Sequence, residues 1–180
     1  MPTPDFKQNY FELFDLPQAY AVDGASLGAR YRQLQRELHP DRFASASEQE
    51  QRVAVQYSAL VNEAYATLGK PLPRALYLLE LAGVSQEQVA AEQVDGGFLI
   101  EQMELREKLE SIDDLVDPDT VLDHLVTEIA ADLQVHQQEF ASAYQNNELK
   151  AAASACVKIQ YLEKIMQEAE QIESNLMDGL

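Results

Sequence analysis

The tripeptide His39-Pro40-Asp41 constrains the fold of this 180-residue chain more than any other feature of the sequence. Pro40 lacks a backbone N–H and disfavours helical geometry at the residue before it, so a helix reaching this point must end near His39. An imidazole and a carboxylate are therefore expected at an exposed turn between two helices. Arg36 and Arg32 lie one and two turns upstream. This arrangement favours binding of a partner over turnover of a substrate.

The segment before the tripeptide has the pattern of an amphipathic helix. Asp23 can cap its start, and apolar residues then recur every three or four positions. These apolar residues are Leu27, Tyr31, Leu34 and Leu38. Arg32 and Arg36 lie nearly opposite this stripe, and Arg30 flanks it. The basic side chains are therefore expected to face water.

A second helix is predicted after the tripeptide. Ser47 and Glu50 form a capping-box pattern, and Gly69 and Pro71 end the helix. Its apolar stripe comprises Val53, Tyr57, Leu60, Val61, Ala64, Tyr65 and Leu68. The two helices are predicted to be antiparallel and joined by residues 39–46. A further short helix is expected from Pro73 to near Gly83.

The rest of the sequence predicts an all-α fold with a second domain. No segment has a convincing strand pattern, and helices are expected at about 97–114, 118–146 and 148–178. Short connections make these helices antiparallel neighbours, which favours a three-helix bundle. The predicted domains are residues 1–82 and residues 97–180, with a linker at residues 83–96.

Composition excludes several classes of function. Residues 1–82 hold 8 Lys and Arg against 10 Asp and Glu, whereas residues 83–180 hold 5 against 21. This asymmetry indicates two units with different partners, and the acidic total of −18 disfavours nucleic acid. No apolar run can span a bilayer and residues 1–5 do not resemble a signal peptide, so no membrane partner is expected. Because Cys156 is the only cysteine, a disulfide within the chain and a cysteine zinc cluster are excluded. We expect a reducing cytoplasm and no cofactor.

The predicted helix at 97–114 has two apolar faces. Its core face comprises Phe98, Leu105, Leu109 and Ile112. Leu99, Ile100 and Met103 point in other directions, alongside Glu104 and Glu107. An exposed apolar patch rimmed by carboxylates is typical of a protein-binding site. The alternative is that the third helix of the bundle buries this second face.

The remaining histidines and the cysteine favour structural roles. His136 falls on the apolar stripe of its helix, so it is expected to be packed and hydrogen-bonded rather than a ligand. His39, His124 and Cys156 are not spaced as a metal site, and Cys156 is expected to be buried. An acidic helical enzyme that uses Glu104, Glu107 or His136 is an alternative of another class. No cleft or nucleophile arrangement surrounds these residues in the pattern.

Four segments carry a resemblance to a known family. They are YFELFDLP at 10–17, LQRELHPDRFAS at 34–45, PRALYLL at 73–79 and FLIEQMELRE at 98–107. Antiparallel helices joined by His-Pro-Asp resemble a J domain, which stimulates the ATPase of DnaK-class chaperones. With the last segment included, the chain resembles the HscB-type J-domain co-chaperones of iron–sulfur cluster assembly. Many relatives have Lys where this chain has Arg42, so positive charge is kept.

The resemblance implies a function without enzymatic activity. It implies binding of an IscU-like scaffold, delivery of that scaffold to an HscA-like DnaK-class chaperone, and stimulation of the chaperone ATPase. Maturation of iron–sulfur proteins in a bacterial cytoplasm would follow. The alternative is a J-domain protein that serves a different client, which would not need the patch at residues 99–107.

The resemblance also implies which residues act. In the chaperone contact, Asp41 would accept hydrogen bonds from a chaperone arginine, Pro40 would hold the turn and His39 would complete its shape. The basic residues of that contact would be Arg32 and Arg36, with Arg30 and Arg42 at the margin. The scaffold contact would comprise Leu99, Ile100, Met103, Glu104, Glu107 and Tyr161.

Overall fold

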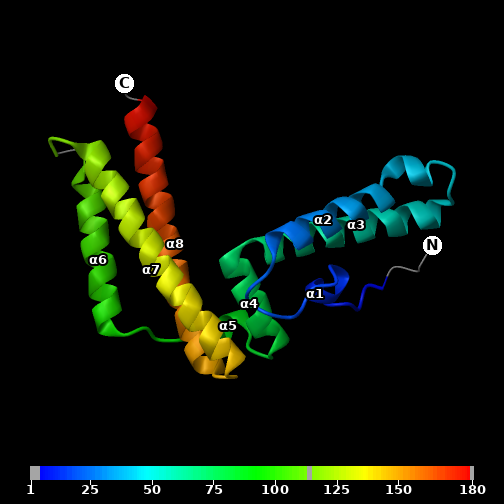
Figure 1. Ribbon diagram of the computed structural model, residues 1–180, viewed down its shortest axis with the longest axis horizontal. Helices are drawn as coiled ribbons and strands as arrows, with labels where there is room; N and C mark the ends of the chain where they lie inside the picture. Colours follow the sequence, from blue (N-terminus) through cyan, green and yellow to red (C-terminus); the bar gives the residue numbers. More distant parts are fainter. Residues whose placement is uncertain (1–4, 113–114, 179–180) are drawn as a thin grey trace. The chain divides into compact units, whose positions relative to one another are not determined.

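The computed structural model describes residues 5–112 and 115–178, and over these ranges its regular secondary structure is all helical (Figure 1). The prediction of an all-α fold is confirmed. None of the helices in these ranges is both long enough and apolar enough to cross a bilayer. The first four residues and the expected helix end at residues 113–114 lie outside the described residues. The chain divides into two compact units, Met1–Leu78 and Leu79–Leu180.

The first unit is organised around an antiparallel helical hairpin. Its elements are α1 (Tyr10–Leu13), α2 (Gly24–Glu37), the 3-10 helix η1 (Pro40–Phe43), α3 (Glu48–Gly69) and α4 (Pro71–Leu81), the last of which runs across the unit boundary. Helices α2 and α3 lie side by side with η1 near their joined ends (Figure 1). Buried Leu27 and Leu34 of α2 and Val61 of α3 belong to the core, as their periodicity predicts.

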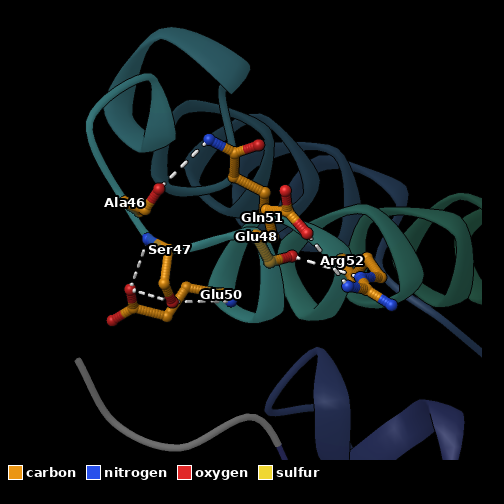
Figure 2. A network of polar contacts seen from close by, with 6 residues as sticks. All are labelled: Ala46, Ser47, Glu48, Glu50, Gln51 and Arg52. Atoms are coloured by element: carbon orange, nitrogen blue, oxygen red, sulfur yellow. Dashed lines mark hydrogen bonds and ion pairs between the residues drawn. The ribbon is translucent and has the colours of Figure 1, made fainter.

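Both hairpin helices begin at the predicted caps. The Asp23 carboxylate accepts hydrogen bonds from the Ser26 hydroxyl and from the backbone N–H groups of Ala25 and Ser26. The bond from the Ser26 hydroxyl, followed by the two backbone bonds, lowers the pKa of Asp23. At the start of α3, the Ser47 hydroxyl and the Glu50 carboxylate form the predicted capping box (Figure 2). These bonds satisfy backbone donors that a helix leaves unpaired at its first turn.

Helix α4 starts two residues earlier than the sequence predicts. It begins at Pro71, directly after α3 ends at Gly69. Proline is tolerated at a first helical position because its missing N–H would have no partner there. The Arg74 guanidinium donates a hydrogen bond of 2.6 Å to the Leu68 carbonyl, so α4 supplies a partner for the end of α3.

The second unit contains the predicted bundle. Its elements are α5 (Gln86–Ala90), α6 (Gly96–Glu110), α7 (Pro118–Gln145) and α8 (Leu149–Asp178). Helices α6, α7 and α8 share one core, and the predicted core face of α6 is confirmed. The predicted residues of that face are all buried: Phe98, Leu105 and Leu109 in α6, and Ile112 just after the helix ends.

The segment at residues 83–96, predicted to be a linker, contains helix α5. Its side chain Val89 is buried and the helix contacts α8. Five residues are too few for an amphipathic period to appear in the sequence. The capping box between Ser85 and Gln88 is the one local signal that points to this helix.

Cys156 and His136 have the structural surroundings predicted for them. Cys156 is fully buried in α8, and burial, with a smaller contribution from Glu163, raises the pKa of its thiol to about 12. His136 is half-buried, with Nδ1 2.7 Å from Glu139 Oε2 and its ring edge-on to Phe98. The thiol therefore stays protonated at neutral pH, and the imidazole is packed and hydrogen-bonded.

Candidate partner-binding surfaces

The tripeptide lies at an exposed turn that begins η1. Helix α2 ends at Glu37, where the Leu38 N–H still donates to the Leu34 carbonyl, and Pro40 opens η1. The His39 Nδ1 accepts a hydrogen bond of 3.3 Å from the Asp41 N–H and lies 3.6 Å from the Asp41 carboxylate. The Asp41 side chain is 91% exposed. Its carboxylate can therefore accept hydrogen bonds from a second macromolecule without any rearrangement of the hairpin.

Three arginines near this turn carry charge that the chain itself does not neutralise. Arg32, Arg36 and Arg42 are exposed, and none forms an ion pair with another residue in the described ranges. The predicted water-facing position of Arg32 and Arg36 is confirmed.

Arg30 differs from these three arginines. Its guanidinium lies 3.0 Å from the Asp15 carboxylate, and its side chain is only 29% exposed. The pair joins the middle of α2 to the segment after α1, so much of this charge is compensated within the first unit. Sequence periodicity cannot reveal the pair because the two residues are brought together by the fold.

The second predicted surface lies on α6 of the other unit. Leu99, Ile100 and Met103 are 38%, 59% and 63% exposed, and both Glu104 and Glu107 are exposed beside them. The alternative that a third helix buries this face is therefore wrong. We call Leu99, Ile100 and Met103, with their two glutamates, the α6 patch. It combines apolar area with a carboxylate rim, which suits a protein partner.

Tyr161 of α8 adjoins the α6 patch. Its ring, 38% exposed, meets the Phe98 ring edge-on with centroids 6.2 Å apart. Phe98 directly precedes Leu99, so the aromatic predicted from the last helix lies at the N-terminal end of the patch. An exposed tyrosine beside aliphatic side chains is typical of binding surfaces.

A lysine that sequence reasoning missed joins α8 to the start of α6. Lys158 Nζ lies 3.2 Å from Asp95 Oδ2 and 5.4 Å from the centre of the Phe98 ring. The other Asp95 oxygen accepts the Phe98 N–H at 2.8 Å, so Asp95 is also the helix cap. The bond from Phe98, followed by that from Lys158, lowers the pKa of Asp95. Nothing in the local pattern around Lys158 signals this contact.

Replacing Lys158 with methionine is expected to loosen the start of α6. Methionine keeps an apolar stem against Phe98 but removes the ammonium that binds Asp95. Hydrogen exchange at the amides of residues 97–100 should become faster than in the parent chain. Lys164→Met, which changes an exposed lysine of the same helix, should leave these rates unchanged. Unchanged exchange in Lys158→Met would show that the Asp95 contact does not hold this helix end.

The described part of the chain holds no cluster of metal-ligating side chains. Over residues 5–112 and 115–178, no three side chains of His, Cys, Asp or Glu are placed to share a metal ion. His136 contacts a glutamate and an aromatic ring, as described above.

Comparison with known proteins finds relatives that match nearly the whole chain. The family model described as the HSCB C-terminal oligomerisation domain matches residues 94–170, which include the α6 patch and Tyr161. A co-chaperone protein HscB homolog of Shewanella loihica is 40% identical over 171 residues, covering 93% of this chain and 99% of the relative.

Solved structures agree with the sequence relatives. Chaperone HscB from Vibrio cholerae is 41% identical with a TM-score of 0.85, covering 94% of this chain and 99% of that chain. The human co-chaperone protein HscB is 33% identical with a TM-score of 0.86, covering 95% of this chain and 85% of that chain. These matches are to co-chaperones, so the alternative of an acidic helical enzyme is not retained. The chain belongs to the HscB co-chaperone family.

Proposed function

We propose that this chain binds an IscU-like iron–sulfur scaffold protein and delivers it to an HscA-like DnaK-class chaperone, whose ATPase it stimulates. Residues 1–82 act as the J domain and residues 97–180 as the scaffold-binding domain. This activity supports the maturation of iron–sulfur proteins. The observation that carries the proposal is the exposed Asp41 carboxylate at the turn between two antiparallel helices, with unpaired arginines beside it.

The basic face of α2 supports the chaperone contact. Arg32 and Arg36 present positive charge to an acidic surface of the chaperone ATPase domain, and Arg42 extends this charge past the turn. Arg30, held by Asp15, contributes at the margin. Such charges mainly set the rate and orientation of encounter. Asp41 then accepts hydrogen bonds from a chaperone arginine, while Pro40 holds the turn and His39 bonds the Asp41 backbone.

The α6 patch and Tyr161 support the scaffold contact. Burying the exposed apolar side chains of this surface against a partner removes them from water and stabilises the complex. The scaffold should therefore present an apolar surface flanked by basic or hydrogen-bond-donating groups, which would pair with Glu104 and Glu107. The same segment separates this family from J-domain proteins with other clients.

A reconstituted ATPase assay tests the proposal. Purified chain is titrated into an HscA-like chaperone, with and without an IscU-like scaffold, and ATP hydrolysis is measured at rising salt concentration. We expect stimulation by the chain, further stimulation with scaffold, and a half-saturating concentration that increases with salt because the arginine contacts are screened.

Arg36→Gln should weaken this salt dependence, whereas Arg52→Gln should not. Arg52 is a suitable control because it is an exposed arginine of α3 that already pairs with Glu48. Absence of stimulation by the parent chain at any concentration would reject the chaperone contact.

A further inference from the structure

One side chain of α3, that of Gln51, is hydrogen-bonded to the segment that follows the tripeptide. Gln51 Nε2 lies 3.1 Å from the Phe43 carbonyl and 3.2 Å from the Ala46 carbonyl, and it donates to both. Figure 2 shows the Gln51 amide reaching back from α3 to Ala46. The Ala46 N–H in turn donates to the Phe43 carbonyl at 3.0 Å. The loop at residues 44–46 is therefore bridged at both ends by the Gln51 amide group.

These bonds act on the element that carries the tripeptide. Phe43 is the last residue of η1, which begins at Pro40, and its side chain is buried. Within η1 the Arg42 N–H donates to the His39 carbonyl at 3.0 Å. The buried Phe43 ring fixes the position at which η1 ends. The bond from Gln51 to the Phe43 carbonyl restricts rotation of η1 about this buried ring. Gln51 therefore contacts the last residue of the short helix whose first turn carries Asp41.

Helix α3 itself does not need Gln51 in order to form. Its first turn is capped by Ser47 and Glu50, which bond each other's backbone N–H groups (Figure 2). The exposed pair of Glu48 and Arg52 flanks Gln51 and makes no contact with the loop carbonyls. The Gln51 amide is directed at the residues before α3, where it donates to the Ala46 carbonyl and is a second donor to the Phe43 carbonyl.

We propose that Gln51 is a positioning residue for chaperone stimulation, acting through the orientation of η1. This inference rests on the proposed function of the tripeptide. Without the two hydrogen bonds, η1 samples orientations in which Asp41 cannot meet the chaperone. When only a fraction of molecules is competent, the apparent dissociation constant rises by the inverse of that fraction. The maximal stimulation at saturation is unchanged because the competent form is the same.

Two substitutions at this position separate the loop contact from helix stability. Gln51→Glu keeps the shape but cannot donate, and its negative charge near the start of α3 favours the helix. Gln51→Lys keeps a donating nitrogen, and its positive charge there disfavours the helix. If the bonds to the loop matter, Glu should impair stimulation and Lys should largely preserve it. If only helix stability matters, the order should be reversed.

The experiment titrates each full-length variant into an HscA-like chaperone and measures ATP hydrolysis alongside thermal unfolding. We expect Gln51→Glu to raise the half-saturating concentration by about three- to tenfold with the same maximum, as for a competent fraction of roughly a tenth to a third. Gln51→Lys should stay within about twofold of the parent chain, since its donor is kept. A half-saturating concentration for Gln51→Glu equal to that of the parent would overturn the inference.

Two controls complete the design. Glu48→Gln changes the neighbouring exposed pair and should leave the titration unchanged. Val61→Ala removes buried methyl groups from α3 far along the helix, so it should lower the melting temperature without shifting the half-saturating concentration. An equal shift for Val61→Ala and Gln51→Glu would also overturn the inference. If the parent chain does not stimulate the chaperone, the proposed function is rejected. That outcome is measured on the parent chain alone, so it is distinguishable from any result with a Gln51 variant.

Discussion

Replacing His39, Pro40 and Asp41 with alanine is expected to abolish stimulation of the chaperone ATPase while circular dichroism stays unchanged. The three side chains are exposed, so their removal leaves the buried core of the hairpin intact. The loss is complete because the substitution removes the Asp41 acceptor and the proline that holds the turn at the same time. Steady-state ATP hydrolysis by an HscA-like chaperone, measured across a titration of the variant, provides the test.

A matched surface variant controls for non-specific effects of alanine substitution. Gln56 and Glu63 are exposed on α3, outside the turn and the basic face of α2. The double variant Gln56→Ala, Glu63→Ala should stimulate the chaperone as well as the parent chain does. Full stimulation by the triple-alanine variant would refute the mechanism assigned to the tripeptide.

Substituting Leu99, Ile100 and Met103 with serine is expected to reduce scaffold affinity strongly. Each truncated anchor of an interface typically costs at least ~1–2 kcal/mol, so three together should weaken binding by about 100-fold or more. The bundle should remain folded because these side chains are exposed in the free protein. Isothermal titration calorimetry with an IscU-like scaffold measures the affinity, and thermal unfolding checks the fold.

Val135 offers a control for this second experiment. It is an apolar residue of α7 that is 52% exposed and lies outside the α6 patch. Val135→Ser should leave scaffold affinity unchanged, since single exposed apolar side chains are common on protein surfaces and carry no binding role by themselves. Equal affinities for the triple-serine variant and the parent would reject the assigned surface.

The two variants should fail in different ways. The triple-alanine chain should still bind the scaffold, and the triple-serine chain should still stimulate the chaperone when no scaffold is present. Each surface lies within its own compact unit. Loss of both activities in either variant would instead indicate that one surface serves both partners.

Helices with strong local signals were predictable. Asp23 and Ser47 mark the starts of α2 and α3 because their side chains bond backbone donors within the next three residues. The core face of α6 follows from the 3.6-residue period, which places Phe98 and Leu105 on one side. Helix α5 was not predicted because five residues show no period, and the start of α4 was placed two residues late, at Pro73, because Pro71 also suits a first helical position.

The candidate surfaces were likewise predictable only in part from the sequence. Exposure of Ile100 and Met103 followed from their angles on the helix, but pattern alone left open whether another helix covers them. Only the packing of α6 against α7 and α8 shows that this face is uncovered. The pair of Lys158 with Asp95 joins residues 63 positions apart, and no local period encodes such a contact.

By itself the sequence determined the all-helical fold, the placement of His39-Pro40-Asp41 between two helices, and the residues available for each surface. These properties depend on interactions within a few positions along the chain: caps, helical periodicity and the conformational limits of proline. Tertiary structure alone decided that Arg30 pairs with Asp15, that Lys158 pairs with Asp95 at the start of α6, and that Gln51 bonds the Phe43 and Ala46 carbonyls. Long side chains reach partners on other elements, and their choice of partner is set by the three-dimensional packing that brings those elements together.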